Sequence, residues 1–217
     1  MAYQASIPNC EKLKRALPRY DFLYENKAFA RVAASSMLYM PTTINLHPNK
    51  VVASRWKLLP FWVETEKEAQ EFTHTLKAEA ESLFDKGSYK SYIQRYRGLL
   101  WVDGYFETHY DEKNDVKEDF CIRKADNGVF SLGIVVAPWL NPETNEIINT
   151  FSVITTEANA QLEKINNISK RMPLIIPEGS RESWLSEDRE EAIKALMLPY
   201  QGSLDAERID RTIYSRM

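Results

Sequence analysis

The chain has 217 residues, of which 44% are hydrophobic and 12% aromatic, and its 28 Lys and Arg residues nearly balance 31 Asp and Glu residues. This length can bury one full core and nothing in the composition demands a second, so we expect a single domain over residues 1–217. The balanced charge excludes a global positive field that would gather nucleic acid or an anionic membrane, and any polyanion site must therefore be local.

The N-terminal segment predicts a short helix and no targeting signal. Pro8 and Asn9 lie where a signal peptide needs an unbroken apolar stretch, and no later segment approaches the length of a membrane span. We therefore expect a cytoplasmic protein without a membrane partner. Asn9 can cap a helix that runs through Leu17, where Pro18 would end it.

Short strands are predicted after this helix. Residues 22–55 are typical of short strands separated by turns, and the nearly continuous apolar run over residues 54–63 favours a strand that enters a buried turn at Pro60. Trp56 and Trp62 are interpreted as core residues, and core packing explains Trp56 better than Trp62.

The centre of the chain predicts two helices. Residues 65–68, with the sequence Thr-Glu-Lys-Glu, form a capping box that opens a helix with Ala69, Phe72 and Leu76 on one face. Residues 88–95 predict a second, shorter helix whose tyrosine stripe is typical of packing rather than of a binding platform.

The second half of the chain predicts further strands and then helices. Asn127 and Gly128 tolerate positive φ, so residues 119–124 and 129–136 are predicted to form a hairpin, followed by a polar loop over residues 138–149. Many strands with a few flanking helices predict an α+β domain built around a mostly antiparallel, barrel-like sheet. The remaining predicted elements are strands at residues 99–102, 151–155 and 174–176 and helices at residues 181–185 and 188–197.

No residue pattern indicates a cofactor or a metal site. Seven glycines and no glycine-rich phosphate loop weigh against nucleotide-binding classes. Cys10 and Cys121 lack a paired spacing, which favours two reduced thiols over a disulfide or a zinc site. His47, His74 and His109 also lack metal-ligand spacing, although His109 lies two residues after Glu107.

Five segments in one order give the chain a family resemblance. They are the Trp and Pro turn over residues 56–62, the Ala-Glu-Ala-Glu-Ser stretch over residues 78–82, Asp-Gly-Tyr-Phe-Glu at 103–107, Thr-Thr-Glu-Ala-Asn at 155–159 and Arg-Met-Pro at 171–173. No single segment is specific, but their order and separations resemble those of the SOS response-associated peptidase family, also called the abasic site processing family. The resemblance covers most of the chain.

The resemblance implies covalent capture of abasic sites, and this chain departs from the residues that perform it. Family members carry a cysteine after the initiator methionine, whose amine and thiol capture the aldehyde of an abasic site in single-stranded DNA; here that residue is Ala2. An α-amine has a pKa of about 7.7 to 8.0, so Ala2 retains an imine-forming amine if Met1 is removed. Closure of a ring through a thiol is lost.

Three further positions of the implied site have changed chemical type. The asparagine and arginine of the family fall on Lys77 and Glu79, and its histidine falls on Asn166, which cannot shuttle protons near neutral pH. Glu79 in place of a phosphate-binding arginine reverses a charge term of about 4 kcal/mol at close range, unless Glu79 is paired. Lys77 is interpreted as a solvated residue or a partner of Glu79, with a nucleophilic lysine as the alternative.

Glu107 retains the glutamate of the family, where a carboxylate relays protons beside the amino-terminal nucleophile. The alternative interpretation is a strand-end carboxylate held by Arg171 or by a backbone amide, and the sequence leaves both open. In the family a wedge corresponding to Pro60 and Trp62 stacks on bases beside the lesion. The positively charged residues considered for a phosphate groove are Arg95, Arg97, Arg123, Lys170 and Arg171.

These features predict a monomeric homologue whose covalent capture of DNA has degenerated and which at most binds single-stranded DNA. One alternative is a lyase or peptidase in which the Ala2 amine forms an imine and Glu107 relays protons. Another is a protein-interaction domain without a DNA substrate, because a fold does not fix a function. The sequence leaves open whether the chain is an enzyme.

Overall fold

The structure is a computed structural model that describes residues 4–209, so the position of Ala2 lies outside the described residues. Its strands are β1 (Gln4–Ile7), β2 (Asp21–Phe22), β3 (Phe29–Ala33), β4 (Tyr39–Ile44), β5 (Lys50–Trp56), β6 (Lys77–Glu79), β7 (Arg97–Val102), β8 (Gly104–Asp111), β9 (Val116–Lys124), β10 (Phe130–Leu140), β11 (Ile147–Glu157), β12 (Arg171–Pro173), β13 (Ile175–Ile176) and β14 (Leu204–Ile209). Its α-helices are α1 (Cys10–Ala16), α2 (Glu66–Glu71), α3 (Gly87–Ile93), α4 (Ala160–Ile165), α5 (Arg181–Ser186) and α6 (Glu190–Ala195).

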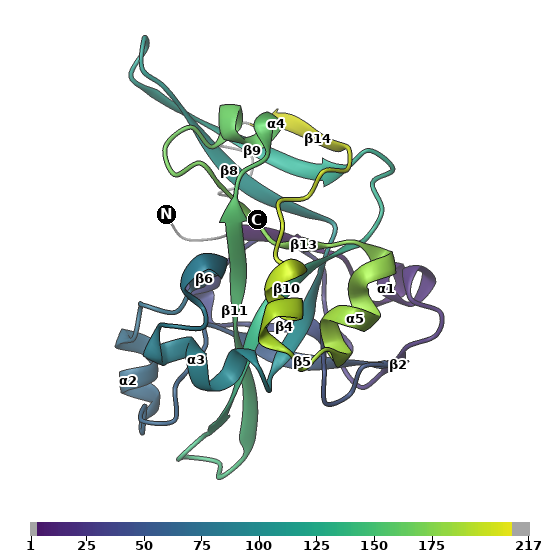
Figure 1. The fold of residues 1–217 in the computed structure, drawn as a ribbon, viewed down its shortest axis with the longest axis vertical. Coiled ribbons are helices and arrows are strands. Elements are labelled where there is room, and N and C mark those ends of the chain that lie inside the picture. The colour runs from purple at the N-terminus through teal and green to yellow at the C-terminus, as the bar shows by residue number, and fades with distance from the viewer. Residues whose placement is uncertain (1–3, 210–217) are drawn as a thin grey trace.

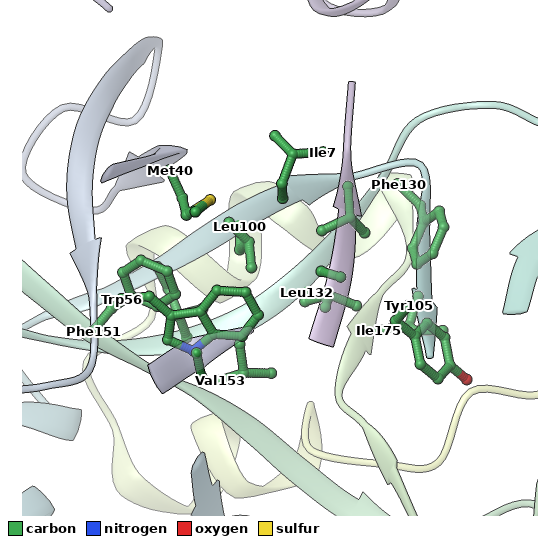
Figure 2. Close-up of a cluster of buried hydrophobic side chains, with 14 of the residues drawn as sticks. Ile7, Met40, Trp56, Leu100, Tyr105, Phe130, Leu132, Phe151, Val153 and Ile175 are labelled. Carbon is green, nitrogen blue, oxygen red and sulfur yellow. The ribbon is translucent and has the colours of Figure 1, made fainter. Parts of the chain in front are cut away.

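Five strands close into a barrel. They follow the order β11-β10-β7-β4-β5 with antiparallel neighbours, and a parallel pairing of β5 with β11 joins the two ends. Large apolar side chains from facing strands fill the interior, among them Trp56, Leu100 and Phe151 (Figure 2). The prediction of an α+β domain with a mostly antiparallel, barrel-like sheet is confirmed.

A second, antiparallel sheet lies at one end of the barrel, where β8, β9 and β14 run side by side, while α3 and α5 flank the barrel (Figure 1). Its strand order is β14-β9-β8-β1-β3. The Ser6 hydroxyl of β1 donates to the Asp103 carboxylate at 2.6 Å, and the Asp103 amide donates to the Ser6 carbonyl at 3.1 Å. These bonds fix the point where the chain passes from β7 in the barrel to β8 in the second sheet.

The helix starts predicted at Asn9 and Thr65 are confirmed, and the helix that follows Thr65 is shorter than predicted. The Asn9 side chain caps α1 and the Thr65 hydroxyl caps α2 by accepting from the Glu68 amide at 3.1 Å. α2 ends at Glu71, so Phe72 and Leu76 lie beyond it rather than on its face. Phe72 has extended backbone angles, and the chain leaves α2 there for β6.

Two predictions about the second half are wrong. β9 and β10 do not form a hairpin, because β9 pairs with β8 and β14 while β10 pairs with β7, β11 and β13. Asn127 does adopt positive φ, at 51°, but the turn transfers the chain between sheets. The predicted loop over residues 138–149 is strand at both ends, since β10 extends to Leu140 and β11 begins at Ile147.

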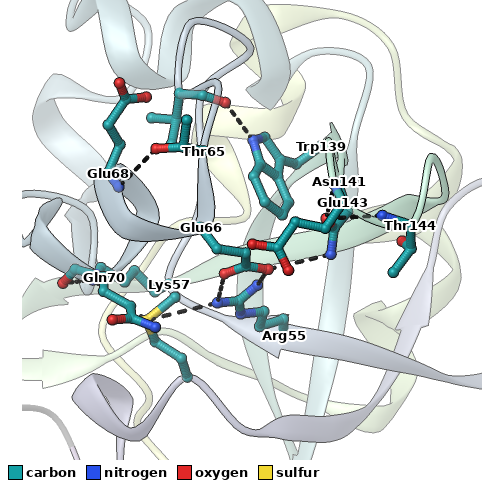
Figure 3. A network of polar contacts seen from close by, with 12 residues as sticks. Arg55, Lys57, Thr65, Glu66, Glu68, Gln70, Trp139, Asn141, Glu143 and Thr144 are labelled. Carbon is teal, nitrogen blue, oxygen red and sulfur yellow. Dashed lines mark hydrogen bonds and ion pairs between the residues drawn. The ribbon is translucent and has the colours of Figure 1, made fainter.

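A network of polar contacts ties the turn after β5 to α2 and to the end of β10 (Figure 3). Arg55 donates to both carboxylate oxygens of Glu66 at 2.8 Å, and the Asn141 amide donates to the same carboxylate at 3.2 Å. The buried Lys57 ammonium donates to the Gln70 carbonyl at 2.9 Å, and burial, followed by the nearby Arg55 charge, lowers the pKa of Lys57. The turn that follows β5 is therefore held on two sides.

Lys57 also has a backbone conformation that favours glycine, with φ at 95°. We therefore expect Lys57→Gly to be more stable than Lys57→Ala by about 1 kcal/mol, since both remove the ammonium but only alanine keeps a Cβ in this conformation. Chemical denaturation of the two variants measures the difference. A more stable alanine variant, as is usual for this pair in regular structure, would contradict the strain at this position.

Candidate functional site

Glu107 lies on β8 at the junction of the two sheets. β8 pairs with β1 and β9, and the alternation of a strand places Tyr105, Glu107 and His109 on one face. Tyr105 is fully buried and Glu107 is partly buried. Burial raises the pKa of Glu107 to about 8, and the Lys77 charge opposes that rise. The carboxyl group is therefore poised to take up or release a proton near neutral pH.

Asn166 holds Glu107 in place. It is the C-terminal cap of α4, it is only 3% exposed, and its side-chain amide donates to the Glu107 carboxylate and to the Arg171 carbonyl, each at 2.9 Å. Its side-chain oxygen accepts from the Ser169 hydroxyl at 3.0 Å and from the Ser169 amide at 3.2 Å. Within residues 4–209 the hydrogen-bond partner of Glu107 is thus Asn166, whereas the Arg171 guanidinium binds Glu81 instead.

Arg171 is engaged in a pair of its own. Its guanidinium donates to both carboxylate oxygens of Glu81, at 2.8 and 3.1 Å, and to the Thr155 carbonyl at 2.6 Å. Burial alone would raise the pKa of Glu81, but the hydrogen bonds from Arg171 and from the backbone outweigh it and the pKa lies below its usual value. A phosphate at Arg171 would have to compete with this bidentate pair.

Lys77 and Glu79 lie on β6, which runs parallel to β11. Glu79 pairs with Lys86 at 3.7 Å rather than with Lys77, whose charge instead acts on Glu107. The side chains of Lys77 and Glu79 both line a hollow of about 430 Å³. Because Glu79 is half exposed and its partner is distant, the negative charge that it adds to this hollow is only partly offset.

The turn over residues 60–63 presents aromatic rings to solvent. Trp62 is 46% exposed, so its interpretation as a core residue is wrong, whereas Trp56 is fully buried and Pro60 is buried as well. Phe61 is 76% exposed and packs edge-on against Trp62, with ring centroids 5.2 Å apart. Sequence reasoning missed Phe61, although two aromatic residues directly after a turn proline were the available signal.

The basic residues considered for a phosphate groove do not act together. Arg97 is 1% exposed and donates to the carbonyls of Ile93, Gln94, Trp184 and Glu187, so it is a structural residue. The Arg123 guanidinium lies 3.7 Å from the Glu207 carboxylate, and the Lys170 ammonium lies 2.9 Å from the Glu163 carboxylate. Arg95 is exposed at the surface. Within residues 4–209, no group of three or more His, Cys, Asp or Glu side chains is arranged to hold a metal ion.

His109 lies beside α4, where its Nδ1 atom is 3.0 Å from the Lys164 carbonyl. This contact and the pairing of the Tyr110 amide with the Asn167 side chain at 2.9 Å dock α4 and the following turn on β8. Asn166 reaches Glu107 because of this docking. The described part of the site therefore consists of Glu107, Asn166 and Lys77, with Glu79 and Arg171 at its borders.

The protein is an α+β domain in which a closed five-stranded barrel is joined to a second sheet. A partly buried glutamate lies at the junction of the two. The chain matches the family model described as SOS response associated peptidase (SRAP) over residues 4–216, and it belongs to that family. A solved structure of a protein from Bacteroides thetaiotaomicron shares 26% identity, with a TM-score of 0.85 over 99% of this chain and 94% of the other. A second, from Bordetella bronchiseptica, shares the fold at 16% identity, with a TM-score of 0.79 over 97% of this chain and all of the other.

Curated relatives carry names that refer to abasic sites. Abasic site processing protein YoqW of Bacillus subtilis is 26% identical over 155 residues, which cover 70% of this chain and 65% of that protein. Abasic site processing protein YoaM of the same organism is 24% identical over 155 residues, which cover 70% of this chain and 64% of that protein. The chain thus spans just under two thirds of the length of these relatives. None of the helices within residues 4–209 has the length and apolar character needed to cross a membrane.

The raised pKa of Glu107 predicts a pH-dependent stability. Between its usual pKa of 4.5 and about 8, the unfolded chain has lost a proton that the folded chain retains, so the stability contributed by this group falls as pH rises through that window. Glu107→Gln cannot lose this proton. We therefore expect its free energy of unfolding to rise relative to that of the native protein by about 1–3 kcal/mol between about pH 4 and pH 9. Urea unfolding across this range measures it, and a constant difference between the two proteins would contradict a raised pKa.

Proposed function

We propose that this protein binds abasic sites in single-stranded DNA without the thiol-dependent covalent capture of its family. The observation that carries the proposal is the Glu107 carboxyl, which is partly buried, acted on by the Lys77 charge and held at 2.9 Å by an asparagine. A proton-transfer group suited to aldehyde chemistry is retained. Its neighbour Asn166 is inert, and residue 2 is an alanine that offers no thiol.

The surface features support a weak, sequence-independent mode of DNA binding. The exposed rings of Phe61 and Trp62 suit stacking on unpaired bases, which is worth about 1–3 kcal/mol per base. Charge contributes little, since Glu79 lies in the hollow of β6 and Arg171 is paired with Glu81. The protein acts in this proposal as a monomeric, cytoplasmic, single-domain member of the family.

Two alternatives have support of their own. The Ala2 amine could form an imine that Glu107 assists, which the raised pKa of Glu107 favours. A protein-interaction domain without a DNA substrate is favoured by the occupied state of Arg171. An adduct trapped by borohydride at the amino terminus would support the imine of Ala2. Absence of any binding to single-stranded DNA at low salt would support the protein-interaction domain.

The central test is binding to single-stranded DNA that carries one abasic site. We expect binding with a shallow salt dependence, because few phosphates are neutralised, and no heat-stable adduct at the amino terminus, because ring closure needs a thiol. Trp62→Ala will weaken binding by about 1–3 kcal/mol through the loss of stacking, measured by fluorescence anisotropy. Leu23→Ala, which alters a residue that is 67% exposed on a different segment, is the matched control and will leave the affinity unchanged. A heat-stable adduct, or equal affinity of Trp62→Ala and the native protein, would refute the proposal.

Glu79 gives a second prediction about the same surface. Glu79→Arg replaces a repulsive charge in the hollow by a phosphate ligand, so we expect tighter binding to single-stranded DNA and a salt dependence steeper by about one counterion. Titrations at several salt concentrations measure both quantities. Glu191→Arg, which makes the same charge change at an exposed site on α6, is the control. An equal gain in both variants would show that the gain is non-local and that no phosphate site exists beside β6.

A further inference from the structure

Lys77 has a fixed backbone and a side chain without a committed partner. β6 aligns Lys77 with Val153 of β11, and the hydroxyl of the buried Tyr89 donates to the Lys77 carbonyl at 2.8 Å. The side chain is partly buried. Among residues 4–209 its ammonium forms neither a hydrogen bond nor an ion pair, and its electrostatic interaction is with Glu107. A lysine held in this way is available for chemistry rather than engaged in stabilising the fold.

The hollow beside Lys77 has the volume and the donor groups to take a deoxyribose. It has a volume of about 430 Å³ and is lined by the ammonium-bearing residues Lys77 and Lys86 and by the hydroxyl-bearing residues Thr73 and Ser88. The Lys86 ammonium lies 3.7 Å from the Glu79 carboxylate, which also lines the hollow, and so offsets part of its negative charge. Hydroxyl groups can donate to sugar oxygens. The hollow therefore combines an amine, a paired lysine and glutamate, and neutral donors.

We propose that Lys77 is the nucleophile of this protein and that its side-chain amine forms a reversible imine with the open-chain aldehyde of an abasic deoxyribose. This inference rests on the proposed function for its substrate. It differs in the attacking atom, because the nitrogen belongs to β6 and not to the amino terminus. An imine on a side chain has no adjacent thiol to close a ring, so the product remains open to hydrolysis.

The steps balance with Glu107 as the proton carrier. The neutral Lys77 amine attacks the aldehyde carbon, a C–N bond forms, and the carbonyl electron pair moves to oxygen. The Glu107 carboxylate accepts one nitrogen proton and returns it to that oxygen, which gives the neutral carbinolamine. Glu107 then delivers a second proton, taken up from solvent and replaced in the last step, to the hydroxyl, and the C–O bond breaks as water leaves. The nitrogen lone pair then completes the C=N bond, and its remaining proton passes to the carboxylate. The sum is an amine and an aldehyde giving an imine and water, with no change of oxidation state.

Glu107 does not line the hollow, and the electrostatic effect of Lys77 on its carboxyl is what links the two groups. The hydrogen bonding and the protonation of Glu107 suit the role of proton carrier. Asn166 keeps one carboxylate oxygen occupied at 2.9 Å, which leaves the other free to exchange a proton. Burial raises the pKa of Glu107 to about 8, so both its acid and its base form are populated near neutral pH. Lys77 is the charged group that acts on this carboxyl.

Reductive trapping tests the inference. The protein is incubated with single-stranded DNA carrying one abasic site in the presence of cyanoborohydride, which converts an imine into a stable secondary amine, and peptide mass spectrometry locates the adduct. We expect the adduct on Lys77. An adduct confined to the amino-terminal residue, or no adduct on DNA that anisotropy shows to be bound, would overturn the inference.

Variants sharpen the test. Lys77→Arg keeps the charge without the nucleophile and will reduce trapping at saturating DNA by at least about tenfold, and Glu107→Gln will slow it by about a hundredfold. Lys90→Arg, at an exposed lysine of α3, is the matched control and will trap as the native protein does. Equal trapping by Lys77→Arg and Lys90→Arg would overturn the assignment.

The two proposals fail in different ways. Binding to DNA without a Lys77 adduct overturns the imine and leaves the proposed function standing. Reductive modification of Lys77 by free deoxyribose 5-phosphate, in a protein that does not bind single-stranded DNA, supports the lysine chemistry and overturns the proposed function.

Discussion

The backbone pairing of β11 is the constraint on which the rest of the structure depends. One edge of this strand pairs in parallel with β5 and then with β6, and the other pairs with β10 and then with β12. Buried backbone groups must find partners, so these pairings are obligatory once β11 lies in the barrel. They close the barrel at β5, place Lys77 at one edge and Arg171 at the other, and leave the Arg171 carbonyl where Asn166 binds it. Asn166 then joins the barrel to β8 through Glu107.

The sequence predicts those parts of the fold that depend on local signals. Asn9 and Thr65 cap helices because their side chains reach amides three residues on, and the order of short motifs identifies the family and its barrel. The partner of a strand is set by contacts distant in sequence, so the Asn127 turn was predicted to close a hairpin although it separates two sheets. Trp56 and Trp62 lie in the same apolar run of the sequence, which does not tell them apart. Only the closure of the barrel distinguishes the buried ring from the exposed one.

The sequence named the residues of the candidate site but did not predict the contacts between them. Asn166 binds Glu107 and the Lys77 charge acts on it, but the hydrogen bond between Glu107 and Asn166 and the ion pair of Arg171 with Glu81 join positions far apart in the chain. At the position where the family resemblance implies a histidine, Asn166 cannot carry protons near neutral pH but does supply a hydrogen-bond donor to the glutamate. The positive charge that acts on Glu107 is that of Lys77. From the sequence, this position was counted only among those whose chemical type had changed.

The turn that carries Phe61 and Trp62 is anchored on both sides. The Phe61 amide donates to the Tyr92 hydroxyl at 3.2 Å, the Val63 amide donates to the Pro60 carbonyl at 3.0 Å, and the indole of the buried Trp139 donates to the Val63 carbonyl at 2.6 Å. The two rings are therefore displayed on a backbone whose conformational entropy was already lost during folding. A flat ligand that settles on Trp62 gains its contact energy without first ordering a loop, and its residence there is limited by the strength of the ring contact alone.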